Sequence, residues 1–304
     1  TYAEAATISL GPVDVLLFWQ SDELVGVMPL QRASGWLGRM GMREPVGRHM
    51  TDYFGLLARP GLQLDWRSLL LKAGVPCLYF THLDESQSAH GLKGDSPKSG
   101  LRTCIHPGGG EAHWEWLRTR DKKLVSDTER RERKLVTEHG PLLFEMQSTS
   151  PVLDLESLVS LKNAQYRRTG HEGGALLDPA NACLLSRLMA SQDTNCQPRL
   201  SVLRCGEQVV AGHFCLPCGP LFHYWFPVYD NQFSAYSPGR ILYRYILLAA
   251  PAHGITCIDR GEGDSPSKRD FANEEHLFFR GLVSSGVRGQ ILSLIQRLKW
   301  RFSA

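Results

Sequence analysis

The sequence contains no apolar run long enough to cross a bilayer. A membrane-spanning helix needs about 20 mainly apolar residues, and polar or charged residues interrupt every apolar stretch sooner than that. The sequence also lacks a large excess of one charge, because it has 34 Lys and Arg and 31 Asp and Glu, which give a formal net charge of +3. This mild basicity does not favour binding to DNA, although it suits an anionic cofactor.

The eight cysteines do not follow the pattern of a disulfide framework. In a chain of 304 residues their irregular spacing is typical of reduced thiols, and it predicts a cytoplasmic location. His213, Cys215, Cys218 and His223 superficially resemble a set of zinc ligands. However, they lie in a predicted strand and beside a tight turn, whereas structural zinc sites stabilise small modules, so we expect no metal. A Gly-x-Ser-x-Gly nucleophile motif is absent as well.

Length and composition indicate two globular domains of the α/β class. The hydrophobic content of 42% and the charged content of 21% are those of a soluble protein with real cores. Val13–Trp19 and Leu24–Leu30, joined by a short polar turn, predict a β-hairpin. Residues 86–110 are rich in Ser, Gly, Pro and Lys and form the loosest predicted connection. We therefore expect an N-terminal domain of residues 1–110 and a C-terminal domain of residues 111–304.

Two further helices carry unusual charge. Trp114–His139 predicts one long helix of mixed charge, which is either a solvated face with i,i+4 ion pairs or a basic ridge facing a phosphorylated acceptor or tRNA. A C-terminal helix has no acidic residue, since the last one in the chain is Glu275. This helix has two interpretations. It docks on the core, or its basic face contacts an anionic membrane surface. We expect its buried stripe to comprise Ile291, Leu294, Ile295, Leu298 and Phe302.

The most informative stretch of the sequence combines a meander with a helix start. Arg199–Cys205, Gln208–Leu216 and Leu221–Tyr229 predict three antiparallel strands separated by turn pairs. An irregular segment then leads to Gly239, which opens an apolar helix, and Ile255–Asp259 predicts the next strand. The first N–H groups of a helix lack intrahelical partners and attract anions, and a glycine there lets a pyrophosphate approach closely.

This order of elements resembles the core of the GNAT acyltransferases. More specifically, it is similar to the cellulose-biosynthesis (CelD-like) branch, which is related to the Fem-type aminoacyl transferases. The chain departs from the usual GNAT phosphate loop, which has two spaced small residues where only Gly239 is present here. The residues that carry the resemblance are Tyr224, Tyr229-Asp230, Ser237-Pro238-Gly239, Asp259, Gly263-Asp264, Lys268 and Phe271.

The resemblance implies tandem GNAT-like mixed sheets flanked by helices, the second of them competent. It implies transfer of an acyl group, most simply acetyl from acetyl-coenzyme A, to an amine of a small-molecule or sugar-linked acceptor. The coenzyme-binding residues implied are Val228, Tyr229, Ser237, Gly239 and Arg240. The catalytic residues implied are Asp259, Asp264, Lys268 and Tyr224.

Asp259 is the residue whose role the sequence itself supports. It ends an apolar strand, so its carboxylate should emerge at the edge of the sheet where ligands of open α/β sheets gather, and there it can orient or deprotonate an amine. Its structural alternative is to cap the segment Asp264–Ala272. Two rival functions also remain, namely a Fem-like transferase that uses aminoacyl-tRNA and a non-catalytic partner in exopolysaccharide assembly.

Overall fold

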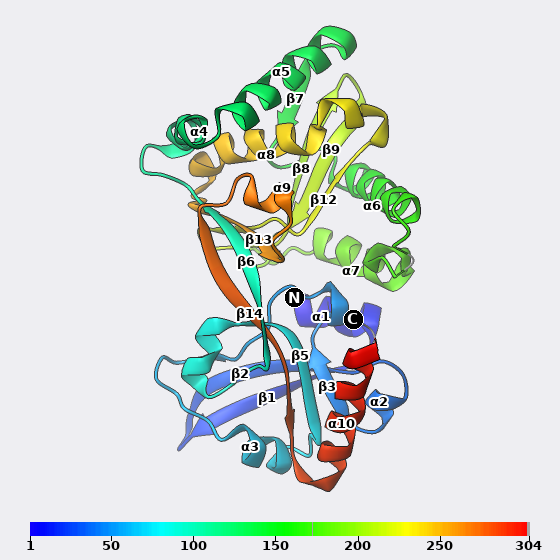
Figure 1. The fold of residues 1–304 in the computed structure, drawn as a ribbon. Coiled ribbons are helices and arrows are strands. Elements are labelled where there is room, and N and C mark those ends of the chain that lie inside the picture. Colours follow the sequence, from blue (N-terminus) through cyan, green and yellow to red (C-terminus); the bar gives the residue numbers. More distant parts are fainter. Residues whose placement is uncertain (172, 303–304) are drawn as a thin grey trace. The chain divides into compact units, whose positions relative to one another are not determined.

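The computed structural model describes residues 1–171 and 173–302. Its residues form two compact units, which are described separately (Figure 1). The terminal unit comprises Tyr2–Ser99 and His276–Ala304, and the central unit comprises Gly100–Glu275 with Thr1. Both combine helices with β-sheet, which confirms the predicted α/β class. The assignment of residues 1–110 and 111–304 to two GNAT-like domains stays a prediction.

The terminal unit is built on the predicted hairpin. Strands β1 and β2 pair antiparallel from Val13↔Gln31 to Gln20↔Glu23, and the side chains of Phe18 and Trp66 meet edge to face in the core below them. The strands, in sheet order, are β1 (Val13–Gln20), β2 (Glu23–Arg32), β3 (Met42–Pro45), β5 (Cys77–Asp84) and β14 (Glu274–Ser284), with β4 (Leu57–Ala58) beside β2. The helices are α1 (Tyr2–Leu10), α2 (Gly35–Arg39), α3 (Trp66–Lys72) and α10 (Gly286–Phe302).

Helix α10 docks through a face that shares Ile295 with the predicted stripe but is centred on Leu292. Leu292 is buried and Ile295 is half-buried against Leu37 and Met42, whereas Ile291, Leu294 and Leu298 are exposed. The side chain of Phe302 lies outside the described part. Both faces of the helix are apolar, so periodicity alone could not show which one packs against the sheet.

The central unit contains two sheets. The first has the order β6 (Ser96–Cys104), β13 (Cys257–Glu262), β11 (Leu221–His223) and β10 (Pro217–Cys218), and the second has the order β12 (Phe226–Tyr229), β9 (Gln208–Cys215), β8 (Arg199–Cys205) and β7 (Leu142–Glu145). The helices are α4 (Gly109–Arg120), α5 (Lys122–His139), α6 (Pro151–Arg168), α7 (Pro179–Met189), α8 (Pro238–Ala249) and α9 (Pro266–Arg269). Trp114, Phe222, Tyr243 and Ile258 lie at the centre of its core.

Two expectations for this unit are wrong. The single helix predicted over Trp114–His139 is broken at Asp121, whose extended φ of −144° ends α4 and whose side chain accepts from the Leu124 N–H to cap α5. The loose connection predicted over residues 86–110 contains strand β6, which pairs with β13. Its polar composition reflects a strand with exposed side chains at Pro97 and Lys98, not a linker.

Candidate active site

The candidate site begins where strands β11 and β13 diverge. The two run parallel and in register up to the pair His223 and Asp259. The chain then bends at Tyr224 and Trp225, and the third predicted meander strand continues as β12, which pairs antiparallel with β9 in the second sheet. One strand of the sequence pattern is thus divided between two sheets, and β12 is an edge strand.

The edge of β12 that faces away from β9 presents main-chain groups. The N–H of Asp230 donates to the carbonyl of Val210 at 2.9 Å. Because hydrogen-bonded and non-hydrogen-bonded pairs alternate along an antiparallel ladder, the main-chain groups of Tyr229 and Pro227 point away from β9. Proline fits such a position, since its missing N–H removes no bond from the ladder. Among the described strands, the outer edge of β12 is therefore unpaired at the place where the two sheets diverge.

Lys162 of α6 reaches this open edge. Its Nζ donates to the carbonyl of Pro227 at 2.9 Å and lies 5.4 Å from the centre of the Tyr166 ring. The surrounding side chains are largely apolar, among them Leu158 and Phe226, and desolvation lowers the pKa of Lys162 to about 8. A fraction of this lysine is therefore neutral near physiological pH and able to accept a proton.

Sequence reasoning did not single out Lys162, although the sequence contained a signal. Leu155, Leu158, Val159 and Lys162 are spaced i, i+3, i+4 and i+7, so the lysine occupies an apolar position of an amphipathic helix. A lysine at such a position must either extend to solvent or lose part of its hydration.

Asp259 is fully buried and engaged by other groups. One carboxylate oxygen, Oδ2, accepts from Arg102 Nε at 2.5 Å, and the other, Oδ1, accepts from the N–H of Gly261 at 2.6 Å. Its main-chain carbonyl accepts from the N–H of Tyr224 at 2.6 Å, directly at the bend. The carboxylate therefore links β6 to β13, and the main-chain carbonyl of Asp259 holds the start of the divergence.

Tyr224 lies at the bend within a buried aromatic stack. Its ring lies parallel to that of His213, with centres 4.3 Å apart, and the guanidinium of Arg260 lies 5.3 Å above it. Burial raises the pKa of Tyr224, so its hydroxyl stays protonated near neutral pH and can donate a hydrogen bond. Desolvation holds the pKa of His213 well below its usual range, and its Nε2 accepts from the N–H of Trp225 at 3.1 Å.

The start of α8 has the form that the sequence predicts for an anion site. Ser237 has left-handed geometry with a φ of 53°, and Pro238 occupies the first turn. A Cβ added at Gly239 would meet only Tyr229, at 3.8 Å, so packing does not require a glycine there. Arg240 is not free, because its guanidinium lies 3.1 Å from Asp270 and 3.6 Å from Asp127.

The remaining predicted residues are spread around this region. Val228 is buried on β12 and faces the apolar side chains of α6. Asp264 is exposed and forms an ion pair with Arg269. Lys268 donates to the carbonyl of Glu262 at 2.6 Å. The structure thus places Tyr224 and Asp259 together at the bend, while Asp264 and Lys268 lie beyond the end of β13.

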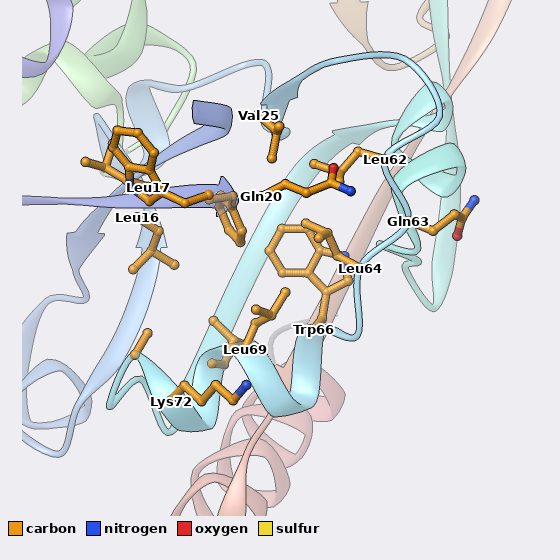
Figure 2. A pocket seen from close by; sticks show the side chains of 14 residues that line it. Leu16, Leu17, Gln20, Val25, Leu62, Gln63, Leu64, Trp66, Leu69 and Lys72 are labelled. Carbon is orange, nitrogen blue, oxygen red and sulfur yellow. The ribbon is translucent and has the colours of Figure 1, made fainter. Parts of the chain in front are cut away.

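Other cavities lie away from these residues. A groove of about 520 Å³ lies in the terminal unit. Figure 2 shows Leu16 and Leu17 of β1 on one side of it and Leu64, Trp66 and Leu69 on the other. Its walls are apolar, and its polar lining side chains include Gln20, Gln63 and Lys72. Among the described residues, no group of three or more His, Cys, Asp or Glu is placed to hold a metal ion.

The central part of the chain is similar to a known family. Residues 122–269 match the family model of the acetyltransferase (GNAT) domain. The matched segment contains all the predicted catalytic and coenzyme-binding residues. No curated protein sequence matches the chain.

Solved structures with the same fold cover nearly the whole chain. FemX shares 12% identity with it, with a TM-score of 0.64 over 97% of this chain and 92% of FemX. The C-terminal domain of a putative lysylphosphatidylglycerol synthetase from Agrobacterium fabrum shares 11% identity, with a TM-score of 0.56 over 97% and 90% of the two chains. L-PGS from Bacillus licheniformis shares 13% identity, with a TM-score of 0.53 over 96% and 91%. At these identities the similarity establishes the fold.

Proposed function

We propose that the protein is an N-acyltransferase that moves an acyl group, most simply acetyl, from coenzyme A to the amine of a small-molecule or sugar-linked acceptor. The observation that carries this proposal is the open edge of β12 beside the unobstructed start of α8 at Gly239, within the segment that matches the GNAT domain. The N–H groups at the start of α8 can bind a pyrophosphate, and the main-chain groups of Tyr229 can bind the amides of the coenzyme. The residue pattern from Tyr224 to Phe271 supports assignment to the CelD-like branch.

The side chains at the bend supply the proton transfers that acyl transfer requires. The acceptor nitrogen attacks the thioester carbonyl, a C–N bond forms, the C–S bond breaks and the thiolate leaves. Lys162, partly neutral near pH 8, accepts the proton that the nitrogen loses. Tyr224 donates a hydrogen bond that stabilises the departing thiolate. Asp264 and Lys268, beyond the end of β13, contact the acceptor.

Asp259 acts as a positioning residue in this scheme. It is fully buried, and both of its carboxylate oxygens already accept from Arg102 and Gly261, so an amine could reach it only after this part of β13 opened. Its contribution is to hold the bend that carries Tyr224.

Calorimetry with acetyl-coenzyme A tests the proposal. Gly239→Trp should weaken binding by roughly tenfold or more, because the indole would occupy the space at the helix start. Gly173→Trp is the matched control, since Gly173 lies between α6 and α7 and a Cβ added there would meet no atom within 4 Å, and it should bind like the wild type. Equal binding by both variants, with unchanged circular dichroism, would remove the pyrophosphate assignment.

A second candidate donor is aminoacyl-tRNA, as used by Fem-type transferases. The observation that favours it is the pair of carboxylates, Asp127 and Asp270, that hold Arg240 at the start of α8, because they repel a pyrophosphate. Binding of aminoacyl-tRNA without binding of acetyl-coenzyme A would select this donor. Failure to bind either would favour the non-catalytic role in exopolysaccharide assembly.

A further inference from the structure

Helix α10 exposes a continuous apolar stripe on the face opposite to its docked face. Val287, Ile291, Leu294 and Leu298 are 74%, 53%, 61% and 44% exposed. At about 100° per residue these four positions lie within a sector of about 60° of the helix. The helix is firmly docked on its other side, where Leu292 is buried and a Cβ added at Gly289 would lie only 2.0 Å from the carbonyl oxygen of Pro76.

Two further exposed apolar side chains lie close to α10. Leu71, 63% exposed, lies at the start of α10, since a Cβ added at Gly286 would be 3.8 Å from its Cδ1. Trp36 of α2 is 49% exposed, and Lys299 Nζ lies 5.5 Å from the centre of its ring. Figure 1 shows α2 and α10 in the same part of the terminal unit. An exposed apolar stripe like that of α10 marks an interaction surface.

The stripe is flanked by positive charge on both sides. At helical spacing, Arg288 and Lys299 lie on one side of it and Arg297 and Arg301 on the other. No Asp or Glu occurs from His276 to the end of the sequence, and Arg297 pairs with Asp95 of the same unit. An aromatic ring beside a lysine, an aliphatic stripe and basic flanks together have the composition of a helix that lies in a lipid interface.

We propose that the exposed face of α10, with Trp36 and Leu71, binds the surface of an anionic bilayer. Headgroups carrying negative charge neutralise cations on both flanks at once, whereas the aliphatic side chains enter the boundary of the acyl chains. The contact is peripheral: within residues 1–171 and 173–302, no helix is both long and apolar enough to cross a membrane. This inference does not depend on the proposed acyl transfer.

Flotation with lipid vesicles tests the inference on the full chain. We expect the protein to bind vesicles rich in phosphatidylglycerol and to bind vesicles of pure phosphatidylcholine far more weakly. Ile291→Ser combined with Leu294→Ser should weaken binding by roughly tenfold or more, because two aliphatic side chains no longer enter the interface. Both residues are exposed, so the fold should be unaffected. Val152→Ser combined with Leu153→Ser is the matched control, since these residues are 66% and 67% exposed on the central unit, and it should bind like the wild type.

The charge requirement is tested separately. Arg288→Gln and Lys299→Gln should each weaken binding to the phosphatidylglycerol vesicles by roughly fivefold, and added salt should weaken the wild type. Equal binding to both kinds of vesicle, or none to either, would overturn the proposal. A dimer in analytical ultracentrifugation that dissociates on Ile291→Ser with Leu294→Ser would overturn it as well, and would make a second copy of the chain the occupant of this face.

Discussion

Replacement of Asp259 by asparagine should destabilise the protein through the loss of a buried charge pair. The carboxylate is fully buried, and its partner Arg102 keeps 22% of its side chain exposed. Asp259→Asn keeps the size of the side chain and an oxygen that can accept from the Gly261 N–H, but it removes the negative charge that the Arg102 guanidinium contacts.

The expected cost is about 2–3 kcal/mol. Removing one partner of a buried ion pair typically costs about 3–5 kcal/mol, and partial hydration of Arg102 places this pair at the lower end. The hydrogen bond to Gly261 is retained, which reduces the loss in free energy of unfolding by about 1 kcal/mol. For a chain of this size, about 2–4 °C of melting temperature correspond to each kcal/mol, so the melting temperature should fall by roughly 5–10 °C.

Urea denaturation followed by circular dichroism measures this cost. Arg102→Met and the double variant complete a double-mutant cycle, which should give a coupling free energy above about 1 kcal/mol. Asp264→Asn is the matched control, because its ion pair with Arg269 is largely exposed and should be worth less than about 1 kcal/mol.

The same variant separates the two roles considered for Asp259. A positioning role predicts the loss of stability described above. The direct role inferred from sequence predicts a fall in turnover on the order of a hundredfold with an unchanged melting temperature. Unchanged stability combined with that fall would refute the structural reasoning and make Asp259 the base.

Two further predictions concern Lys162 and the cysteines. Because desolvation lowers the pKa of Lys162 to about 8 from its ordinary 10.5, the unfolded chain binds more protons between these values and the free energy of unfolding should rise with pH across that window. Lys162→Met should abolish this rise in the free energy of unfolding, which is on the order of 2–3 kcal/mol. It should also remove any increase of kcat/KM up to pH 8. If the stability of the variant still rises over this pH window, the lowered pKa does not belong to Lys162. The thiol oxidant diamide should form a disulfide between Cys104 and Cys257 before any other pair, because these residues oppose each other across β6 and β13 with Sγ atoms 3.3 Å apart. Peptide mapping by mass spectrometry would identify the first disulfide, with Cys104→Ser as the control. A different first disulfide would contradict the prediction.

Features that depend on neighbours in the chain could be predicted from the sequence. The hairpin of β1 and β2 and the pairing of β8 with β9 follow from strand-type runs joined by short turns, and both are present. The start of α8 follows from the Ser237-Pro238-Gly239 segment, since a proline suits the first turn of a helix. These preferences act over a few residues, so periodicity and turn composition carry them.

Other features depend on which distant segment a strand or helix packs against, and only the tertiary structure decided them. The sequence of Leu221–Tyr229 is typical of one strand, but its first half pairs with β13 and its second half with β9. The bend between them is held by the main-chain carbonyl of Asp259, which comes from another strand and accepts from the Tyr224 N–H. Helix α10 has two apolar faces, and packing on the sheet buried the face of Leu292 and left that of Leu294 in solvent. Lys162 gained its lowered pKa only when α6 packed against β12. Burial depends on contacts between segments that are distant in the sequence, and local sequence does not encode these contacts. They determine which charged groups are desolvated and which apolar side chains stay exposed to solvent.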